Sequence, residues 1–133
     1  MARKAIATGN ASAPLGAYSQ AVEANGFVFA SGQINALPDG TMVSGQFKDQ
    51  ARQALANLKE VFGAAGLGLF EVAKVTVYMA DLKDYAELNE AYAEFFQPPF
   101  PARAVVQAAA LPRGASIEIE AIAARAPDPD RCH

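Results

Sequence analysis

The order in which helical and strand-like periodicities follow one another most constrains the fold of this chain. Apolar residues recur at three- and four-residue spacing over 47–65, where Gly66 supplies a stop, and over 85–96, before Pro98-Pro99. This spacing predicts two amphipathic helices. Strand-like runs lie at 27–33, 71–80, 102–110 and 116–124. Strand–helix–strand units imply parallel strands joined by right-handed crossovers, so we expect both helices on one face of a single sheet.

Asn25-Gly26 is the clearest turn signal. It separates the strand-like runs 20–24 and 27–33, and both central residues of a type I′ hairpin turn need a positive φ, which Asn and Gly adopt readily. A short strand is also expected at 4–7, and Asp84 with Glu87 resembles a capping box at the start of the second helix. The chain should therefore place antiparallel strands ahead of its strand–helix–strand units.

Alternation along the strands separates two faces of the expected sheet. One face is apolar and suits contact with the helices: Ala73, Val75, Val77, Met79, Ala104, Val106, Ala108, Ile117, Ile119, Ala121 and Ala123. The other face mixes charged and medium-sized apolar side chains: Lys74, Thr76, Tyr78, Arg103, Val105, Gln107, Glu118, Glu120 and Ile122. Because both helices are used on the first face, we expect the second face to form an interface or a cleft and to be buried by oligomerisation.

Composition narrows the chemistry that the chain can perform. The 133 residues include one Cys and one His, which are the last two residues, Cys132 and His133. Disulfide scaffolds, Cys/His metal sites and Ser-His or Cys-His catalysis are therefore excluded from the folded body. A net charge of −3 and a pI of about 5.1 argue against a surface built to bind nucleic acid. Carboxylates, Arg, Tyr, Ser and backbone groups are left to carry any reaction.

The length suits one domain. We expect it to span 1–126 and to be followed by an unstructured Pro/Asp tail at 127–133. No run approaches the roughly 18 apolar residues that cross a bilayer, and the first residues lack the apolar segment of a secretory signal. The sequence thus predicts a soluble, cytoplasmic protein.

Arg103 and Glu118 are the strongest candidates for chemistry. By parity they fall on the same face of the sheet, and two readings stay open. They form a buried or interfacial ion pair, or Arg103 binds a substrate carboxylate with two donors while Glu118 positions a water or moves a proton. Glu120 shares this face, but a single Glu-x-Glu in a strand is a weak signal.

Four further residues stand at strand ends or on a helix: Tyr18, Ser31, Gly32 and Asn89. Taken singly, Tyr18 and Ser31 are typical of turns and strand ends, and Asn89 is typical of the solvent-facing side of a helix. Gly32 could let a ligand approach the backbone closely.

Several short segments, spread in order along nearly the whole chain to about Arg125, match the motifs of one family. The C-terminal part contains Pro101-Ala-Arg-Ala-Val-Val, then Leu111, five residues, and Ile117-Glu-Ile-Glu-Ala-Ile-Ala. Further matches are Gly16-x-Tyr18-Ser-Gln-Ala, Phe29-Ala-Ser-Gly-Gln33, Ala51-Arg-Gln-Ala-Leu-x-Asn-Leu, and Val75-Thr-Val-Tyr-Met-Ala-Asp-Leu82 with Asn89. Together these segments resemble the RidA family, also called YjgF/YER057c/UK114.

The resemblance implies a chorismate-mutase-like α+β fold that assembles as a homotrimer, with its helices outside and its sheets packed inward. It places the last strand between the 27–33 and 72–79 strands and leaves the Arg103 strand nearer the edge. Ligand clefts lie between subunits in such an assembly, so Arg103 is expected to meet groups of a neighbouring chain.

The resemblance also implies an activity and its residues. Active members hydrolyse reactive 2-imino or enamine acids to 2-oxo acids and ammonia without a metal or cofactor, which implies a 2-iminobutanoate/2-iminopropanoate deaminase. By matching positions, the resemblance implies that Arg103 binds the substrate carboxylate and that Glu118 orients the attacking water. The residues that line or support the pocket are Tyr18, Ser31, Gly32 and Asn89. Two positions depart from the family pattern: Val105, expected to keep an apolar wall, replaces a frequent Cys, and Ala17 replaces a frequent Pro.

Two other functions stay open. A non-catalytic binder of small carboxylates, either a 2-oxo acid sensor or a holdase-like protein, would use the same cleft. An RNA-directed activity, as an endoribonuclease or translation inhibitor, is disfavoured by the acidic pI, the lack of a basic stripe and the lack of His in the body. The expected partners are therefore small 2-imino or 2-oxo acids and further copies of the chain, with no membrane.

Overall fold

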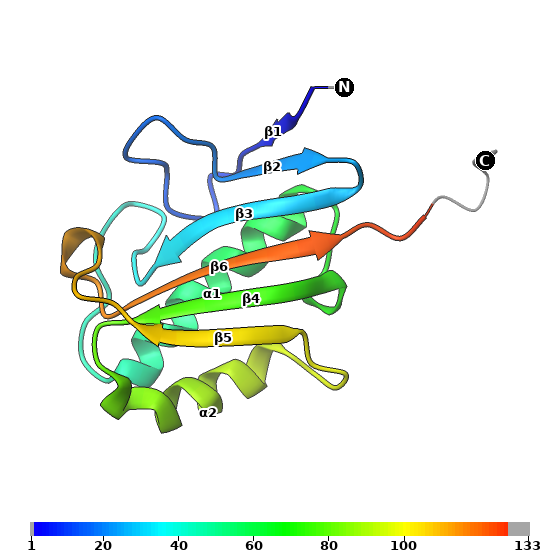
Figure 1. Cartoon of the computed structure of the whole chain (residues 1–133). Coiled ribbons are helices and arrows are strands. Elements are labelled where there is room, and N and C mark those ends of the chain that lie inside the picture. The colour runs from blue at the N-terminus through cyan, green and yellow to red at the C-terminus, as the bar shows by residue number, and fades with distance from the viewer. Residues whose placement is uncertain (1, 128–133) are drawn as a thin grey trace.

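Six strands form one mixed sheet, and two helices lie against it (Figure 1). The computed structural model describes residues 2–127. The strands are β1 (Lys4–Ile6), β2 (Ala21–Ala24), β3 (Phe27–Ile34), β4 (Val72–Met79), β5 (Ala102–Gln107) and β6 (Ile117–Ala124), and the helices are α1 (Phe47–Ala64) and α2 (Tyr85–Phe95). The expected helices and strands are thus confirmed. The expected tail at 127–133 lies outside the described residues, apart from Pro127.

The strand order β1-β2-β3-β6-β4-β5 places the last strand of the chain inside the sheet. β6 runs antiparallel to both β3 and β4, so β3 and β4 are parallel to each other, and β5 pairs with β4 in parallel at the edge. This confirms the parallel strands expected from the two strand–helix–strand units and the strand positions implied by the family resemblance. The hairpin turn is confirmed too, because φ is 52° at Asn25 and 81° at Gly26.

The hydrophobic core lies between the helices and one face of the sheet. α1 buries a stripe at three- and four-residue spacing, whose fully buried members include Ala51, Leu55, Leu58 and Phe62. The helix stops where expected, since Gly66 follows it with a φ of 77°. In Figure 1 α1 lies behind the sheet and leaves the face toward the viewer uncovered. No helix within residues 2–127 combines the length and the apolar character needed to cross a membrane.

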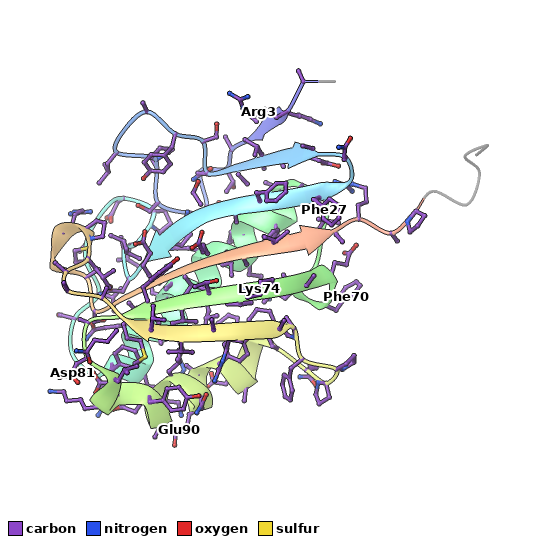
Figure 2. The ribbon with its side chains drawn as sticks, viewed as in Figure 1. Arg3, Phe27, Phe70, Lys74, Asp81 and Glu90 are labelled. Atoms are coloured by element: carbon purple, nitrogen blue, oxygen red, sulfur yellow. The ribbon has the colours of Figure 1, made fainter. Side chains whose placement is uncertain are left out.

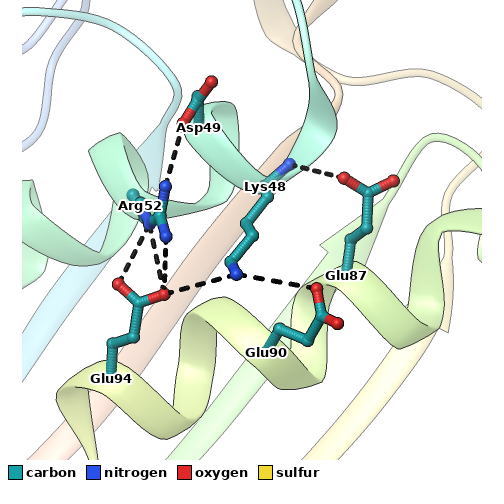
Figure 3. Close-up of polar contacts among 6 residues, drawn as sticks. All are labelled: Lys48, Asp49, Arg52, Glu87, Glu90 and Glu94. Carbon is teal, nitrogen blue, oxygen red and sulfur yellow. Dashed lines mark hydrogen bonds and ion pairs between the residues drawn. The ribbon is translucent and has the colours of Figure 1, made fainter.

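Polar contacts tie α2 to α1 (Figure 3). Lys48 Nζ lies 3.7 Å from a carboxylate oxygen of Glu90 and 3.7 Å from one of Glu94. Arg52 donates to both carboxylate oxygens of Glu94 at 2.8 to 3.3 Å. These side chains are partly solvent-exposed, so each pair contributes about 0–1 kcal/mol. Together they hold the orientation of α2, which carries Asn89.

The expected capping box at the start of α2 is wrong. Asp84 has φ −88° and ψ 11°, and its side chain makes no capping hydrogen bond. A side-chain cap needs extended backbone at that position, and Asp84 instead ends a short 3₁₀ turn. Glu87 Oε1 accepts from the backbone N–H of Lys48 at 3.2 Å and so contacts the other helix.

The predicted faces of the sheet are confirmed for β6 and for most of β4. Their apolar positions are buried on the helix side: Val75, Val77, Met79, Ile117, Ile119, Ala121 and Ala123. Ala73 is an exception, because the pairing of β4 with β6 shifts between Val72 and Lys74. This bulge buries Val72 and exposes Ala73.

The predicted faces are wrong for β5. Its register sets Arg103 opposite Val75, and residues paired across two strands point to the same side of a sheet. Arg103 and Val105 therefore lie on the helix side, and Ala104 and Val106 lie on the other. Because this strand has apolar residues at both parities, alternation does not determine its phase. Its edge position lets the Arg103 guanidinium extend past the core.

The uncovered side of the sheet, called the open face below, combines aromatic, apolar and charged side chains. It carries Phe27, Phe29, Lys74, Thr76, Tyr78, Ala104, Val106, Glu118, Glu120 and Ile122. Figure 2 shows this face, with Phe27 and Lys74 labelled. Phe27 and Phe29 are 46% and 40% exposed, which is high for large apolar side chains next to each other.

Candidate functional site

Arg103 lies where three side chains of α2 surround its guanidinium. Nη2 donates to the hydroxyl oxygen of Tyr85 at 3.0 Å and to Oδ1 of Asn89 at 2.9 Å. The guanidinium carbon lies 4.7 Å from the ring centroid of Tyr92, which is a cation–π contact. Positions 85, 89 and 92 follow one another at helical spacing, so α2 presents all three toward Arg103. These neutral groups hold the cation in place and leave its charge uncompensated.

The remaining donors of Arg103 suit an anion. A guanidinium has five N–H donors, and within residues 2–127 its hydrogen bonds use Nη2 and no carboxylate forms an ion pair with it. A cavity of about 340 Å³ borders it, lined by Asn89, Tyr92, Ala93, Phe100, Pro101 and Arg103. A planar cation with free donors beside a small, mostly apolar cavity can bind a carboxylate with two parallel hydrogen bonds.

Glu118 lies on the open face, where β6 sets it opposite Tyr78 of β4 and Ile34 of β3. Burial raises the pKa of the Glu118 carboxyl, and the nearby Glu120 carboxylate raises it further. Within the described part of the chain no Lys or Arg forms an ion pair with it. A carboxylate with a raised pKa is a stronger base, so it can accept a proton from a bound water more readily.

A β-bulge brings the backbone of β3 against Glu118. The register of β3 on β6 shifts between residues 30 and 33, so Ser31 and Gly32 fall outside the regular ladder. Ser31 Oγ donates to the carbonyl oxygen of Ser19 at 2.7 Å, which anchors the bulge. A Cβ at position 32 would lie 2.7 Å from Cδ and 2.8 Å from Cγ of Glu118. Glycine at this position therefore leaves the room that the Glu118 side chain occupies.

Tyr18 borders the same cavity as Glu118. This second cavity measures about 210 Å³ and is lined by Ser12, Ala13, Leu15, Gly16, Tyr18, Gly32, Gln33, Ile34, Pro112 and Glu118. Tyr18 is 52% exposed, and its hydroxyl accepts from the N–H of Leu15 at 3.3 Å. Buried Gln20 ties this segment to the residues that follow β1, because its amide exchanges hydrogen bonds with the backbone of Thr8 at 2.7 and 3.1 Å. The two cavities share no lining residue.

The expectation that Arg103 and Glu118 share a face is wrong. They point to opposite sides of the sheet, line different cavities and form no ion pair with each other, because β5 has the opposite phase from the one predicted. One chain therefore holds the candidate residues in two groups. Arg103 contacts Asn89 on the helix side, whereas Glu118 lies with Tyr18 and the bulge of Ser31-Gly32 on the open face.

The surroundings of Arg103 differ from the sequence-based expectation at Val105 and at two tyrosines of α2. Val105 lies beside Arg103, packs against the core and lines neither cavity, so its role as an apolar wall stays a prediction. Sequence reasoning missed Tyr85 and Tyr92, although their spacing of four and three residues from Asn89 was a usable signal. Within residues 2–127, no three His, Cys, Asp or Glu side chains gather in a group that could hold a metal ion.

Sequence comparisons agree on one family. A family model described as endoribonuclease L-PSP matches residues 8–125. The 2-iminobutanoate/2-iminopropanoate deaminase of Rattus norvegicus is 48% identical over 126 residues, which cover 94% of this chain and 92% of that protein. A RutC family protein of Pyrococcus horikoshii is 49% identical over 122 residues, which cover 91% of this chain and 97% of that protein.

Solved structures share the fold. The crystal structure of E. coli TdcF with bound serine matches with a TM-score of 0.88 and 42% identity, covering 92% of this chain and 99% of that one. RidA from the Antarctic bacterium Psychrobacter sp. PAMC 21119 matches with a TM-score of 0.87 and 43% identity, covering 91% and 98%. The chain therefore belongs to the endoribonuclease L-PSP family, which is the RidA (YjgF) family that its motifs resemble.

Proposed function

We propose that this protein hydrolyses 2-imino acids such as 2-iminobutanoate and 2-iminopropanoate to 2-oxo acids and ammonia. The rat and human relatives that bear the name of this activity are 48% and 45% identical over 126 residues. The observation that carries the proposal is the Arg103 guanidinium, which keeps free donors beside a cavity and has no carboxylate partner among residues 2–127. The carboxylate of a 2-imino acid supplies that partner.

In this mechanism Arg103 binds the carboxylate and Glu118 activates a water. A protonated imine carbon is already electrophilic, so the protein needs to hold the anion and aim the water. Glu118 takes a proton from the water as the water oxygen bonds to C2, which gives a carbinolamine. Glu118 then passes that proton to the nitrogen. The C–N bond breaks with its electron pair on nitrogen, and Glu118 takes up the hydroxyl proton as the C=O bond forms. Glu118 returns this proton to the departing ammonia, so one protonated imine and one water give one 2-oxo acid and one ammonium ion, with no cofactor in the scheme.

The opposite placement of Arg103 and Glu118 gives this proposal a quaternary consequence. Since they border separate cavities, one chain does not bring both to the same substrate. We propose a homotrimer in which each active site takes Arg103 from one subunit and Glu118 from the next. The exposed aromatic pair Phe27 and Phe29 on the open face supports burial of this face against another copy.

A coupled assay tests the proposal. A threonine dehydratase generates 2-iminobutanoate, semicarbazide traps the imine that escapes hydrolysis, and the purified protein should lower the trapped fraction. Arg103→Ala should lose about 10²–10⁴-fold in kcat/KM, because two charge-assisted hydrogen bonds are worth about 3–6 kcal/mol together. Arg3→Ala, which removes an exposed Arg just before β1, is the matched control and should keep full activity. No acceleration by the wild type, or equal activity in Arg103→Ala, would overturn the proposal.

A second candidate function is a non-catalytic sensor of small carboxylates. The serine bound in the structure of the relative TdcF favours it, because serine carries a carboxylate. Titration calorimetry with 2-oxobutanoate separates the two functions. Binding that requires Arg103, together with no effect on imine hydrolysis, would support the sensor and contradict the deaminase.

A further inference from the structure

Two carboxylates lie close together on the open face without a cation between them. Glu118 and Glu120 are two residues apart on β6, so both project from the same side of the sheet. Both are partly buried. Within residues 2–127 neither forms an ion pair with Lys or Arg. Burying like charges side by side costs free energy, so the arrangement calls for a group that stabilises one of them.

Tyr78 is that group. It lies opposite Glu118 in the register of β4 and β6, while Thr76 lies opposite Glu120. The Tyr78 hydroxyl nevertheless donates a short hydrogen bond to Oε1 of Glu120 rather than to Glu118. Diagonal neighbours on antiparallel strands are within reach of an aromatic side chain. The Tyr78 backbone therefore pairs with Glu118, while its side chain crosses to the Glu120 carboxylate. The side chain thus limits the positions that both carboxylates can adopt.

Few other titratable groups face Glu118. On β6 the neighbour is Glu120, on β4 it is Tyr78, and from the segment before β2 it is Tyr18, which lines the same cavity. β3 places Gly32 and Ile34 there, neither of which titrates, and the loop before β6 contributes Pro112 to the cavity. Lys74 lies farther along β4, opposite Ile122. The charge nearest to Glu118 along this face is therefore that of Glu120.

We propose that Tyr78 and Glu120 form a positioning pair, in which Tyr78 anchors the Glu120 carboxylate beside Glu118 and so sets the charge that Glu118 faces when it exchanges protons with water. The consequence for catalysis rests on the proposed deaminase function, whereas the pair itself rests on the contacts of β4 and β6. Tyr78 and Glu120 are positioning residues, since they act through Glu118 and touch no reacting atom.

The physical reasoning has two parts. A fixed negative charge near Glu118 disfavours a second negative charge, which raises the pKa of the Glu118 carboxyl in addition to burial. The hydrogen bond to Glu120, with burial, raises the pKa of the Tyr78 phenol, so Tyr78 stays protonated and keeps its role as donor. The hydrogen bond from Tyr78 fixes the position of the Glu120 carboxylate, and the neighbouring Glu118 becomes the better base.

Carboxylate titration by NMR tests the pair without reference to activity. In intact protein labelled with ¹³C-glutamate, the Glu118 resonance is assigned from its loss in Glu118→Gln. Glu120→Gln should move the titration midpoint of Glu118 to lower pH, because it removes the neighbouring charge. Tyr78→Phe should move the midpoint in the same direction, because Glu120 then loses the donor that holds its carboxylate beside Glu118 and can turn away from it. Glu60→Gln, an exposed position on α1, is the matched control and should leave the midpoint unchanged.

Two results would overturn the pair. One is an unchanged Glu118 midpoint in either variant. The other is an additive effect in the double variant, since residues that act through one hydrogen bond should not add. In the imine assay, Glu120→Gln should shift the acidic limb of kcat/KM to lower pH and reduce kcat/KM at pH 8 by about tenfold, less than the 10²–10⁴-fold expected for Glu118→Gln. An inactive wild type whose midpoints still shift would reject the deaminase and keep the pair. An active enzyme whose Glu118 midpoint does not shift in the variants would reject the pair and keep the deaminase.

Discussion

Gly32→Ala separates the geometry of the site from the stability of the fold. The backbone at position 32 lies outside the left-handed region, so alanine introduces no backbone strain. Its Cβ would, however, lie 2.7 Å from Cδ and 2.8 Å from Cγ of Glu118. Carbon atoms in contact are normally about 3.5–4.0 Å apart, so the carboxyl group must move by about 1 Å.

This displacement should cost activity far more than stability. Glu118 has a flexible side chain and can rotate away at a cost of about 0.5–1.5 kcal/mol. A misplacement of about 1 Å at a reacting group can reduce kcat/KM by about 10²-fold. We therefore expect Gly32→Ala to lose about 10²-fold in the coupled imine assay while its free energy of unfolding in urea falls by about 1 kcal/mol or less.

Gly63→Ala is the control for this prediction. Gly63 lies in α1, and nothing would lie within 4 Å of its new Cβ. Gly63 is exposed in the last turn of α1, so alanine should add no more than about 1 kcal/mol, which is its gain over glycine in a helix interior, and the variant should be fully active. A Gly32→Ala protein with wild-type kcat/KM would refute the argument that the bulge positions Glu118.

Two further predictions concern stability, measured at equal protein concentration because an oligomer gains stability with concentration. Glu118→Gln should raise Tm at pH 7. The pKa of Glu118 is higher in the folded than in the unfolded protein, so ionisation of Glu118 destabilises the fold once the pH exceeds the folded-state pKa. Below the unfolded-state pKa the carboxyl is protonated in both states and this effect is absent. An increase in Tm that persists at pH 3 would contradict this prediction. Asn57→Leu should lower the free energy of unfolding by about 2–4 kcal/mol, because the buried Asn57 Nδ2 donates to the carbonyl oxygens of Ile34 and Ala36. Urea unfolding checks it, and a loss below about 1 kcal/mol would be inconsistent with unpaired buried carbonyls.

Local sequence signals predicted most of the fold because the elements are locally consistent. The hairpin follows from Asn25-Gly26, where two positive φ values are needed, and α1 follows from an apolar stripe that ends at Gly66. The faces of β6 follow from a strict alternation of apolar and polar residues from Ile117 onward. In each case the residues that determine the structure are adjacent in sequence.

The phase of β5 could not be predicted in the same way. Ala and Val occupy both parities of Ala102–Gln107, so either face could have met the core. The register is determined instead by the backbone pairing with β4 and by the contacts of Arg103 with Tyr85, Asn89 and Tyr92. These contacts join residues far apart in sequence, which alternation does not report.

The same limit applies to the candidate site. Parity predicts Arg103 and Glu118 on one face of the sheet, and the family motifs imply their roles. The structure places them on opposite faces, which supports the proposal that the site combines groups of two chains, as the family resemblance implies for its ligand clefts. Composition and periodicity describe one chain at a time, so they do not indicate which residues of two chains would meet in the proposed trimer.

Mixing two inactive variants tests the central claim most directly. Arg103→Ala retains Glu118, and Glu118→Gln retains Arg103, so in the proposed homotrimer neither variant alone has a complete site. If the variants are unfolded together in equal amounts and refolded, random assembly should give about one quarter of the sites both an intact Arg103 and an intact Glu118 from adjacent subunits. The account predicts recovery of about a quarter of the wild-type imine hydrolysis. Activity no greater than the mean of the two variants, in mixed trimers verified by mass spectrometry, would contradict it.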